Sequence, residues 1–278
     1  PVDAEPQIDR AEELREKWQT ATGQLWQLGE HRLICGDCTD AAVVARVMDG
    51  EKASLIVTDP PYGVNYSELR SSQAEIRRTT VDYKDIDADD FTGNELQEFL
   101  EKVFRACKEN LNINAAWYLW HAQLTQGFFA AAAAAADILI HRQIIWVKPS
   151  FIFGRGDYHW KHELCFYGWR KGNRPPFYGQ RNQDTVWNID AGGGSSGGTH
   201  KDHPTQKPVI LYEIPLKNHT TESEIILDPF CGSGTAIIAA ENLGRKCRAI
   251  EISPAYVAVA LERWSAATGK TPVLLENV

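Results

Sequence analysis

The stretch from residue 225 to residue 251 constrains the fold more than any other part of the chain. It reads as an apolar strand, a glycine-rich turn, an apolar helix and a second strand, and the turn has the sequence Asp228-Pro229-Phe230-Cys231-Gly232-Ser233-Gly234-Thr235. Strand, helix and strand in this order form a βαβ unit, whose two strands lie parallel. The segment therefore predicts an open parallel sheet that binds a ligand at the glycine turn.

The rest of the chain repeats this alternation. We expect helices at residues 8–18, 40–49, 94–110, 128–137, 235–243 and 254–268. We expect a hairpin at residues 24–35 and strands at residues 53–58, 115–120, 138–148 (ending at Pro149), 159–169, 224–227 and 246–251. This alternation predicts an α/β fold with a mainly parallel sheet and helices on both faces.

One domain accounts for most of the chain. We place an N-terminal linker and helix at residues 1–23 and a single domain at residues 24–278. Residues 66–91 are polar and charged, which is typical of a mobile loop. The sequence starts at Pro1, so we expect it to be part of a longer protein.

Composition indicates the cellular location of the protein. No apolar run is long enough to cross a bilayer and no signal peptide opens the sequence, so we expect no membrane partner. The six cysteines are scattered, which favours a reducing, cytoplasmic location.

The net charge of −8 conceals a basic stretch. Residues 141–181 hold eight basic residues against two acidic ones, which leaves +6 there and −14 elsewhere, and ten aromatic residues lie in the same stretch. This composition is typical of a local phosphate-binding surface. A solvated surface above an aromatic core fits it equally well.

The glycine turn and Glu251 indicate the kind of ligand. Glycines let backbone amides approach a ligand closely, and Glu251, 19 positions after Gly232, can accept hydrogen bonds from both hydroxyls of a ribose. A dinucleotide fingerprint needs a third glycine near Ile237, which is absent, and the chain has no Gly-Lys-Ser/Thr phosphate loop. We therefore expect an adenosyl ligand without phosphates rather than NAD or ATP.

The pentapeptide Asp59-Pro60-Pro61-Tyr62-Gly63 follows an expected strand. Because open α/β sheets bind ligands at the carboxyl ends of their strands, Asp59 should face the ligand site. An exocyclic amine of a base is a poor nucleophile, and the Asp59 carboxylate and Pro60 carbonyl can grip its N–H bonds and stabilise the charge that develops on nitrogen. Tyr62 offers a face for stacking an extruded base. The alternative is a Pro-Pro turn that only caps a strand.

The two motifs resemble the catalytic and cofactor motifs of the DNA amino-methyltransferases, which make N6-methyladenine or N4-methylcytosine from S-adenosyl-L-methionine. The catalytic motif comes first in the chain, as in the β-class of that family. The resemblance implies a Rossmann-like S-adenosylmethionine-dependent methyltransferase fold with a circularly permuted motif order. It also implies duplex DNA with a flipped base as the partner.

Further similarities extend the resemblance over residues 24–265. His203-Pro204-Thr205-Gln206-Lys207-Pro208 resembles the family's tenth motif, which holds the methionine end of the cofactor. Gly36-Asp37 resembles the third motif, whose acid meets the adenine, and Ile145-Trp146-Val147-Lys148-Pro149 resembles the eighth motif, near the target base. Residues 12–38 look like the join in phage and mobile-element proteins where a ParB-like domain precedes a methylase.

The resemblance assigns roles to individual residues. The implied catalytic residues are Asp59, Pro60, Pro61 and Tyr62. The implied cofactor-binding residues are Asp37, Cys38, Asp59, His203, Thr205, Gln206, Lys207, Asp228, Pro229, Phe230, Gly232, Gly234, Thr235, Glu251 and Ile252.

The expected target-recognition region is residues 170–201, which are rich in glycine. Together with the basic stretch it supplies the expected DNA contacts Lys148, Arg155, Lys161, Arg170, Lys171, Arg174 and Arg181. Asn173, Gln180, Asn182 and Gln183 are expected at base edges. So small a region predicts a short or relaxed target sequence.

Asp59 favours adenine as the target, because many cytosine-N4 enzymes of the family carry Ser at this position. A cytosine-N4 enzyme is the first alternative. An RNA or protein-glutamine amino-methyltransferase, which usually carries Asn there, and an inactive DNA-binding module are the others. We expect a bacterial or phage-encoded, nucleoid-associated protein, and the oligomeric state stays open, with a homodimer among the candidates.

We expect no metal site. The Cys35/Cys38 and His200/His203 pairs have spacings that suit zinc, but both overlap expected cofactor motifs. The acidic cluster at residues 82–90 fits a solvated loop, and Cys231 fits a packing role.

Overall fold

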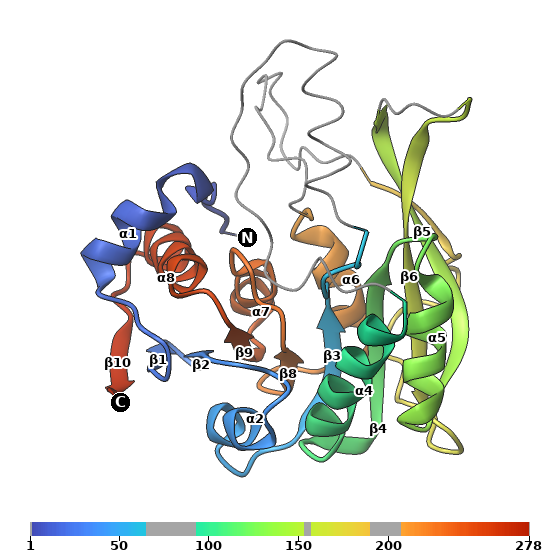
Figure 1. Cartoon of the computed structure of the whole chain (residues 1–278), viewed down its shortest axis with the longest axis horizontal. Coiled ribbons are helices and arrows are strands. Elements are labelled where there is room, and N and C mark those ends of the chain that lie inside the picture. The colour runs from blue at the N-terminus through green and yellow to red at the C-terminus, as the bar shows by residue number, and fades with distance from the viewer. Residues whose placement is uncertain (1, 65–92, 153–156, 190–206, 278) are drawn as a thin grey trace.

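The structure is a computed structural model that describes residues 2–64, 93–152, 157–189 and 207–277 (Figure 1). Over these residues one ten-stranded sheet has the strand order β10-β1-β2-β9-β8-β3-β4-β6-β5-β7. The strands are β1 (Leu25–Leu28), β2 (His31–Cys35), β3 (Ala53–Thr58), β4 (Leu111–His121), β5 (Ile138–Ile152), β6 (Trp160–Arg170), β7 (Val186–Asn188), β8 (Ile225–Asp228), β9 (Lys246–Glu251) and β10 (Val273–Glu276).

The central strands lie parallel. β2, β9, β8, β3 and β4 are neighbours in this order, and each pair is parallel. β6 is antiparallel to both β4 and β5, so it begins at the edge where β4 and β5 run toward their carboxyl ends. The chain continues from β8 to β9 on one side and from β3 to β4 on the other. A topological switch point, where open α/β sheets bind ligands, therefore lies between β8 and β3.

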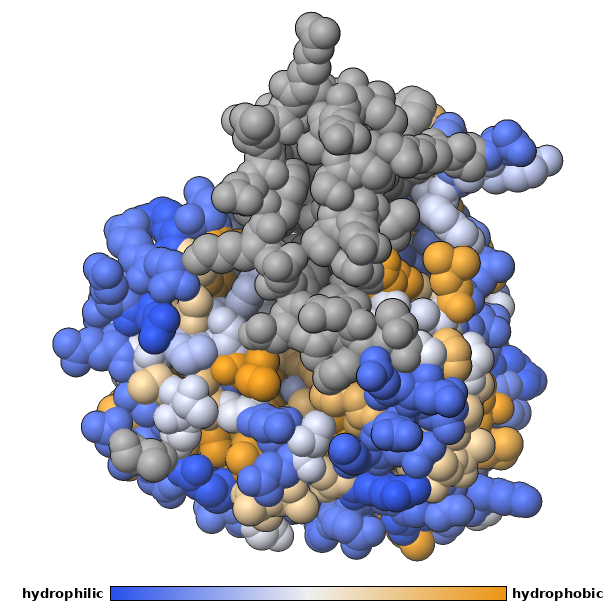
Figure 2. All heavy atoms as spheres, in the orientation of Figure 1, coloured by the Kyte–Doolittle hydropathy of each residue, from blue (hydrophilic) through white to orange (hydrophobic). Residues whose placement is uncertain are grey.

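Helices cover both faces of the sheet. They are η1 (Ile8–Arg10), α1 (Ala11–Trp18), α2 (Ala41–Met48), α4 (Asn94–Lys108), α5 (Gln126–Ala135), α6 (Ile210–His219), α7 (Thr235–Leu243) and α8 (Pro254–Thr268). α6, α7 and α8 share a buried cluster with Leu55 and Val57 of β3, whereas α2, α4 and α5 share another with Ile56. Successive strand residues point to opposite faces, so β3 serves both cores. Figure 2 shows hydrophilic side chains over the outer surfaces of α1 and α4.

The predicted α/β fold with a mainly parallel sheet is confirmed, but the strand expected to end at Pro149 is longer. β5 continues to Ile152, and its ladder with β6 is interrupted between Val147 and Ile152. Proline cannot donate a ladder hydrogen bond, and the interruption accommodates it without ending the strand.

Three elements were missed. They are α6, β7 and β10, and α6 carries Pro215 inside the helix, which hides its helical pattern. The loop expected at residues 66–91 lies outside the described residues, as does the end of the region at residues 170–201.

The N-terminal segment packs onto the domain. Leu14 of α1 is buried against Ala258 and Val259 of α8. Trp18 Nε1 donates a hydrogen bond to Glu262 Oε2 at 2.8 Å. The boundary proposed at residue 23 is thus not a break in packing. None of the described helices combines the length and the apolar character needed to cross a membrane.

Gly168 tests how tightly β6 fits against β5. A Cβ atom at Gly168 would lie 2.5 Å from the backbone oxygen of Leu139, which cannot move aside as a side chain could. We expect Gly168→Ala to lower the free energy of unfolding by about 1–3 kcal/mol in urea denaturation. Gly127→Ala is the matched control, because a Cβ there meets nothing within 4 Å and the residue lies in α5. Equal stability of the two variants would contradict this packing.

Candidate active site

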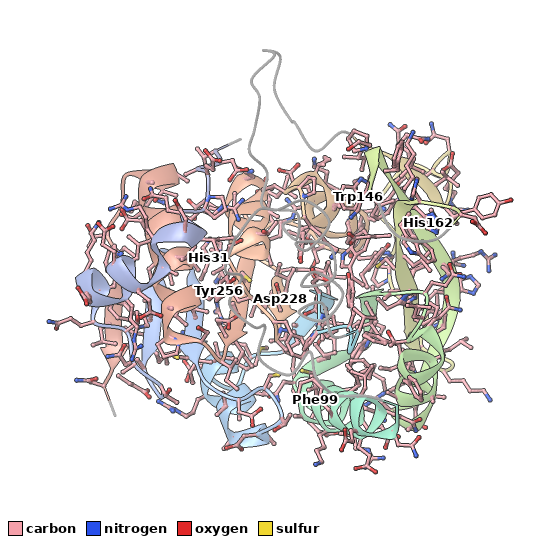
Figure 3. All side chains as sticks on the ribbon, turned by 45° about the horizontal axis from the view of Figure 1, so that its top comes forward. His31, Phe99, Trp146, His162, Asp228 and Tyr256 are labelled. Carbon is pink, nitrogen blue, oxygen red and sulfur yellow. The ribbon has the colours of Figure 1, made fainter. Side chains whose placement is uncertain are left out.

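The two sequence motifs meet at the switch point. Leu55 pairs with Ile226 and Ile56 with Leu227, so β3 and β8 end side by side. Thr58 Oγ1, the last side chain of β3, donates a hydrogen bond to Asp228 Oδ1 at 2.6 Å. Figure 3 shows Asp228 along this edge of the sheet, between Tyr256 of α8 and Trp146 of β5.

Asp59 is the centre of a partly buried hydrogen-bond network. Tyr62 donates its hydroxyl proton to Asp59 Oδ1 at 2.7 Å, and Lys207 Nζ donates to Asp59 Oδ2 at 2.5 Å. Lys207 Nζ also donates to the Tyr62 hydroxyl oxygen at 2.8 Å and lies 5.0 Å from the Trp120 ring centre. Burial of Lys207 opposes its charge, but Asp59 and Glu163 outweigh burial and raise the pKa of Lys207. The sequence placed Lys207 at the cofactor, whereas the structure brings its charge to Asp59.

Glu163 at the start of β6 extends this network and was not predicted. Its Oε2 lies 3.1 Å from Lys207 Nζ, and its Oε1 lies 2.5 Å from Lys148 Nζ. Burial favours the neutral acid, but Lys207 and Lys148 outweigh it and lower the pKa of Glu163 to about 2. Lys148, expected at DNA, is only 13% exposed and belongs to this ion pair. The only sequence signal for Glu163 was that it is the one acidic residue of a strand that also carries Lys161 and Arg170.

Aromatic rings line the same edge. Tyr62 meets Phe129 edge-on with ring centres 6.4 Å apart, and His121 at the end of β4 lies 5.8 Å from Phe129 and 4.0 Å from Phe166. Within the described part of the chain neither ring nitrogen of His121 has a hydrogen-bond partner. Burial and then the Lys207 charge lower the pKa of His121 to about 3, so the ring is neutral.

The glycine turn stands open beside Asp228. Gly232 has φ of +52°, and a Cβ there would meet nothing within 4 Å. Glu251 Oε2 accepts a hydrogen bond from the Gly232 amide at 2.8 Å, and Oε1 accepts one from the Ser253 amide at 2.9 Å. The Gly36 amide donates to the Glu251 carbonyl at 2.9 Å, so Asp37 lies next to the same turn. This arrangement brings the residues expected at an adenosine together.

Asp228 is a buried carboxyl group with a free acceptor. Oδ1 accepts from Thr58 and from the Phe230 amide, whereas no described group hydrogen-bonds Oδ2. Burial raises the pKa of Asp228 to about 7 despite those two hydrogen bonds. An unpartnered buried acceptor beside an open glycine turn fits a cationic donor, such as the ammonium group of S-adenosylmethionine.

The remaining expected cofactor residues divide into three groups. His203, Thr205 and Gln206 lie outside the described residues. Phe230 packs against Phe99, and Ile252 is half exposed beside the turn. Cys38, Pro229 and Thr235 are buried, and burial raises the pKa of the Cys38 thiol, which makes it inert. Cys231, which was expected to pack in the core, is buried as well.

Arg170 and Lys171, both expected at DNA, lie far from Asp59 in the structure. β6 runs away from the site, and these residues lie seven and eight positions after Glu163, roughly 23 Å or more along the strand. The Lys171 amide donates to the Asp137 carbonyl, which precedes β5 at the opposite edge of the sheet. Gln183, expected at a base edge, instead exchanges two hydrogen bonds with Asn218 at 2.8 Å. Arg155 lies outside the described residues.

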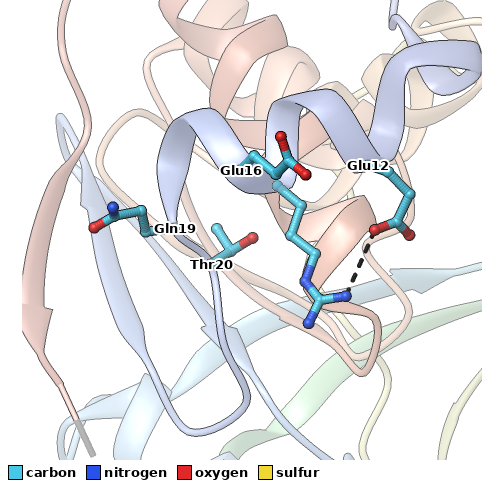
Figure 4. Close-up of a pocket in the computed structure, with 5 residues that line it drawn as sticks. Glu12, Glu16, Gln19 and Thr20 are labelled. Carbon is cyan, nitrogen blue, oxygen red and sulfur yellow. Dashed lines mark ion pairs between the residues drawn. The ribbon is translucent and has the colours of Figure 1, made fainter.

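A surface hollow lies apart from these groups. Five residues of α1 and the following turn line it, and Arg15 pairs there with Glu12 at 3.5 Å (Figure 4). The lining residues are Glu12, Arg15, Glu16, Gln19 and Thr20. None of them belongs to the network around Asp59.

Solved structures share the fold. M1.HpyAVI in its complex with SAM superposes with a TM-score of 0.59 at 21% identity, covering 83% of this chain and 97% of that one. The cytosine-N4-specific PvuII DNA methyltransferase superposes with a TM-score of 0.61 at 13% identity, covering 87% and 88%. The fold is that of the S-adenosylmethionine-dependent methyltransferases.

Sequence comparison then gives the family. The profile of the N6/N4 DNA methylases, described as DNA methylase, matches residues 53–262, and the chain belongs to this family. Its relatives include the type II methyltransferase M2.DpnII of Streptococcus pneumoniae, 27% identical over 232 residues, which cover 79% of this chain and 85% of the relative. M2.MboI of Moraxella bovis is 26% identical over 255 residues, which cover 86% and 88%. S-adenosyl-L-methionine is the cofactor of this family, as the sequence predicted.

Asp228 makes stability depend on pH in a defined window. Its pKa is about 7 in the folded protein against 3.8 ordinarily, so the folded state binds the extra proton between these values. Wild type should therefore lose stability relative to Asp228→Asn as pH rises from about 4 to about 7, by about 2–4 kcal/mol in all, with no further change above pH 8. Urea denaturation of the cofactor-free proteins measures this, and a pH-independent difference would contradict it.

Proposed function

We propose that this protein is an adenine-N6 DNA methyltransferase that uses S-adenosyl-L-methionine. The observation that carries the proposal is the position of Asp59 at the end of β3, hydrogen-bonded to Tyr62 and Lys207, beside the open glycine turn at the end of β8. Asp rather than Ser at this position favours adenine over cytosine-N4, which is the alternative.

The cofactor site of the proposal uses residues from both halves of the sheet. Glu251 and Asp37 would hold the ribose and adenine, and the amides of Gly232 and Gly234 would lie against the ligand. The free oxygen of Asp228 would accept a hydrogen bond from the amino group of the methionine end. When bound, S-adenosylmethionine supplies a methyl group on a sulfonium, which leaves as a neutral thioether.

The reaction needs no covalent enzyme intermediate. Asp59 and the Pro60 carbonyl accept hydrogen bonds from the two N–H groups of the amine on the flipped base. This favours a pyramidal nitrogen and exposes its lone pair. Held in this way, the nitrogen would present its lone pair to the methyl group of the sulfonium, and Asp59 or water would take the one proton that the methylated nitrogen releases. Tyr62 and the aromatic wall with Phe129 and His121 provide faces for the base.

Chain order supports the β-class assignment. The catalytic motif follows β3 and the glycine turn follows β8, and these strands lie side by side although the motif order is permuted. A ParB-like domain before residue 12 is a part of the proposal that rests on the resemblance alone, and a homodimer is one candidate for the oligomeric state.

Asp59→Ala should abolish methyl transfer, because the amine loses its charged acceptor, while cofactor affinity changes little. Incubation of both proteins with labelled cofactor and plasmid DNA, followed by mass spectrometry of nucleosides, measures this. We expect labelled N6-methyl-2′-deoxyadenosine from wild type and none from the variant, with calorimetry as the control for cofactor binding.

Each other outcome has a definite meaning. Retained activity of Asp59→Ala would overturn the assignment. N4-methylcytosine from wild type would support the alternative. Cofactor binding without methylated DNA would leave an RNA or protein-glutamine substrate, and a lack of cofactor binding would leave an inactive DNA-binding module.

The β5–β6 hairpin is the arm best placed for DNA. Its strands extend beyond the edge of the sheet that carries Asp59 (Figure 1). Tyr158 is 94% exposed and Trp160 is 45% exposed, and Lys161 lies beside them on the surface. Exposed aromatic and basic side chains together suit a nucleic-acid backbone and its bases.

Lys161→Ala should weaken DNA binding several-fold at low salt. It should also reduce the salt dependence of the affinity by about one counterion, since each phosphate contact contributes a slope of roughly 0.9. Lys171→Ala is the matched control, because Lys171 lies at the opposite edge of the sheet. Fluorescence anisotropy over a salt series measures both, and a larger effect of Lys171→Ala would contradict the arrangement.

A further inference from the structure

The acceptor atoms of Asp59 are already engaged in this structure. Tyr62 donates to Oδ1 at 2.7 Å and Lys207 Nζ donates to Oδ2 at 2.5 Å. The proposed reaction needs Asp59 to accept an N–H from the target amine. The short, charge-assisted bond from Lys207 is therefore the contact that an incoming amine has to displace.

Lys207 has a second acceptor within reach. Glu163 Oε2 lies 3.1 Å from Nζ, a longer contact than the one to Asp59. The other oxygen of Glu163 is held by Lys148 at 2.5 Å, and its backbone pairs with Trp146 in the sheet. Glu163 is thus fixed, whereas a lysine ammonium on its four-carbon stem can shift toward it by a small change of side-chain torsion.

We propose that Glu163 is a positioning residue for methyl transfer. Its carboxylate accepts the hydrogen bond of the Lys207 ammonium when the target amine replaces Lys207 as the donor to Asp59. The inference rests on the proposed function and adds a residue that the sequence motifs do not contain. The negative charges of Asp59 and Glu163 together balance the positive charges of Lys207 and Lys148. Without the charge of Glu163, Asp59 is the only anionic partner that Lys207 has among the described residues, and one positive charge of the two lysines is left unbalanced beside a nitrogen that itself becomes positive. Lys207 is 4% exposed, so solvent screens this repulsion poorly.

Glu163→Gln is the test, because it keeps the shape of the side chain and removes its charge. Three quantities are measured for wild type and variant: the single-turnover methylation rate on a duplex that wild type modifies, the cofactor affinity, and the affinity for duplexes with adenine or purine at the target position. Purine lacks the exocyclic amine, and S-adenosylhomocysteine replaces the cofactor in these binding assays. Glu213→Gln is the matched control, since Glu213 is 12% exposed and pairs with Lys217 in α6 at 2.8 Å.

We expect the methylation rate of Glu163→Gln to fall by about tenfold or more, the scale set by one hydrogen bond to a charged group. Cofactor affinity should stay within about twofold of wild type, a difference under 0.5 kcal/mol. The preference for adenine over purine should disappear, whereas Glu213→Gln should match wild type in all three measurements.

A rate equal to that of Glu213→Gln, or an unchanged preference for adenine over purine, would overturn the inference while leaving the proposed function intact. Parallel losses of rate and cofactor affinity would also overturn it, because they indicate a structural role. Absence of DNA methylation by wild type would overturn the proposed function and this inference with it.

Discussion

The pairing of β3 with β8 is the contact on which both the fold and the site depend. Leu55 and Ile56 pair with Ile226 and Leu227 in the middle of the sheet, and each strand contributes to the cores on both faces. A slip of one residue would turn every β3 side chain to the opposite layer. Core packing therefore fixes the register, and the register places the Asp59 motif beside the glycine turn, although 170 positions separate Thr58 from Asp228.

Stability alone does not explain the charges gathered at this edge. Buried ion pairs lose hydration that their attraction only partly returns, and a buried carboxyl without a full set of donors is unfavourable. Lys207 and Glu163 form such a buried ion pair. Asp228 is such a buried carboxyl group, and burial raises its pKa to about 7. Such an arrangement suits a site that accepts a cationic ligand, because the carboxyl groups that would receive it are held in place before it arrives.

Local sequence patterns predicted the parts of the molecule that local patterns control. The βαβ unit at residues 225–251, the hairpin before Cys35 and the strand leading to Asp59 all follow from apolar runs and turn residues. Glu163 could not be found this way, because its role depends on β6 lying between β4 and β5, a pairing that no local pattern specifies. α6 was hidden by Pro215 for a different reason, since tertiary packing overrode a residue that disfavours helix interiors.

Strand direction separates charged residues that are near one another in the sequence. Glu163 and Arg170 stand at the two ends of one antiparallel strand, so one reaches the site and the other the far edge. The chain returns to the site only at β7, which runs parallel to β5 and pairs Asn188 with Val147. Of the described residues beyond β4, the outer part of the β5–β6 hairpin and the last residues of β7 lie at the edge of the sheet that carries Asp59, so the proposed DNA contacts belong there. Residues 171–185 instead connect the two edges of the sheet, from the contact of Lys171 with Asp137 to the start of β7.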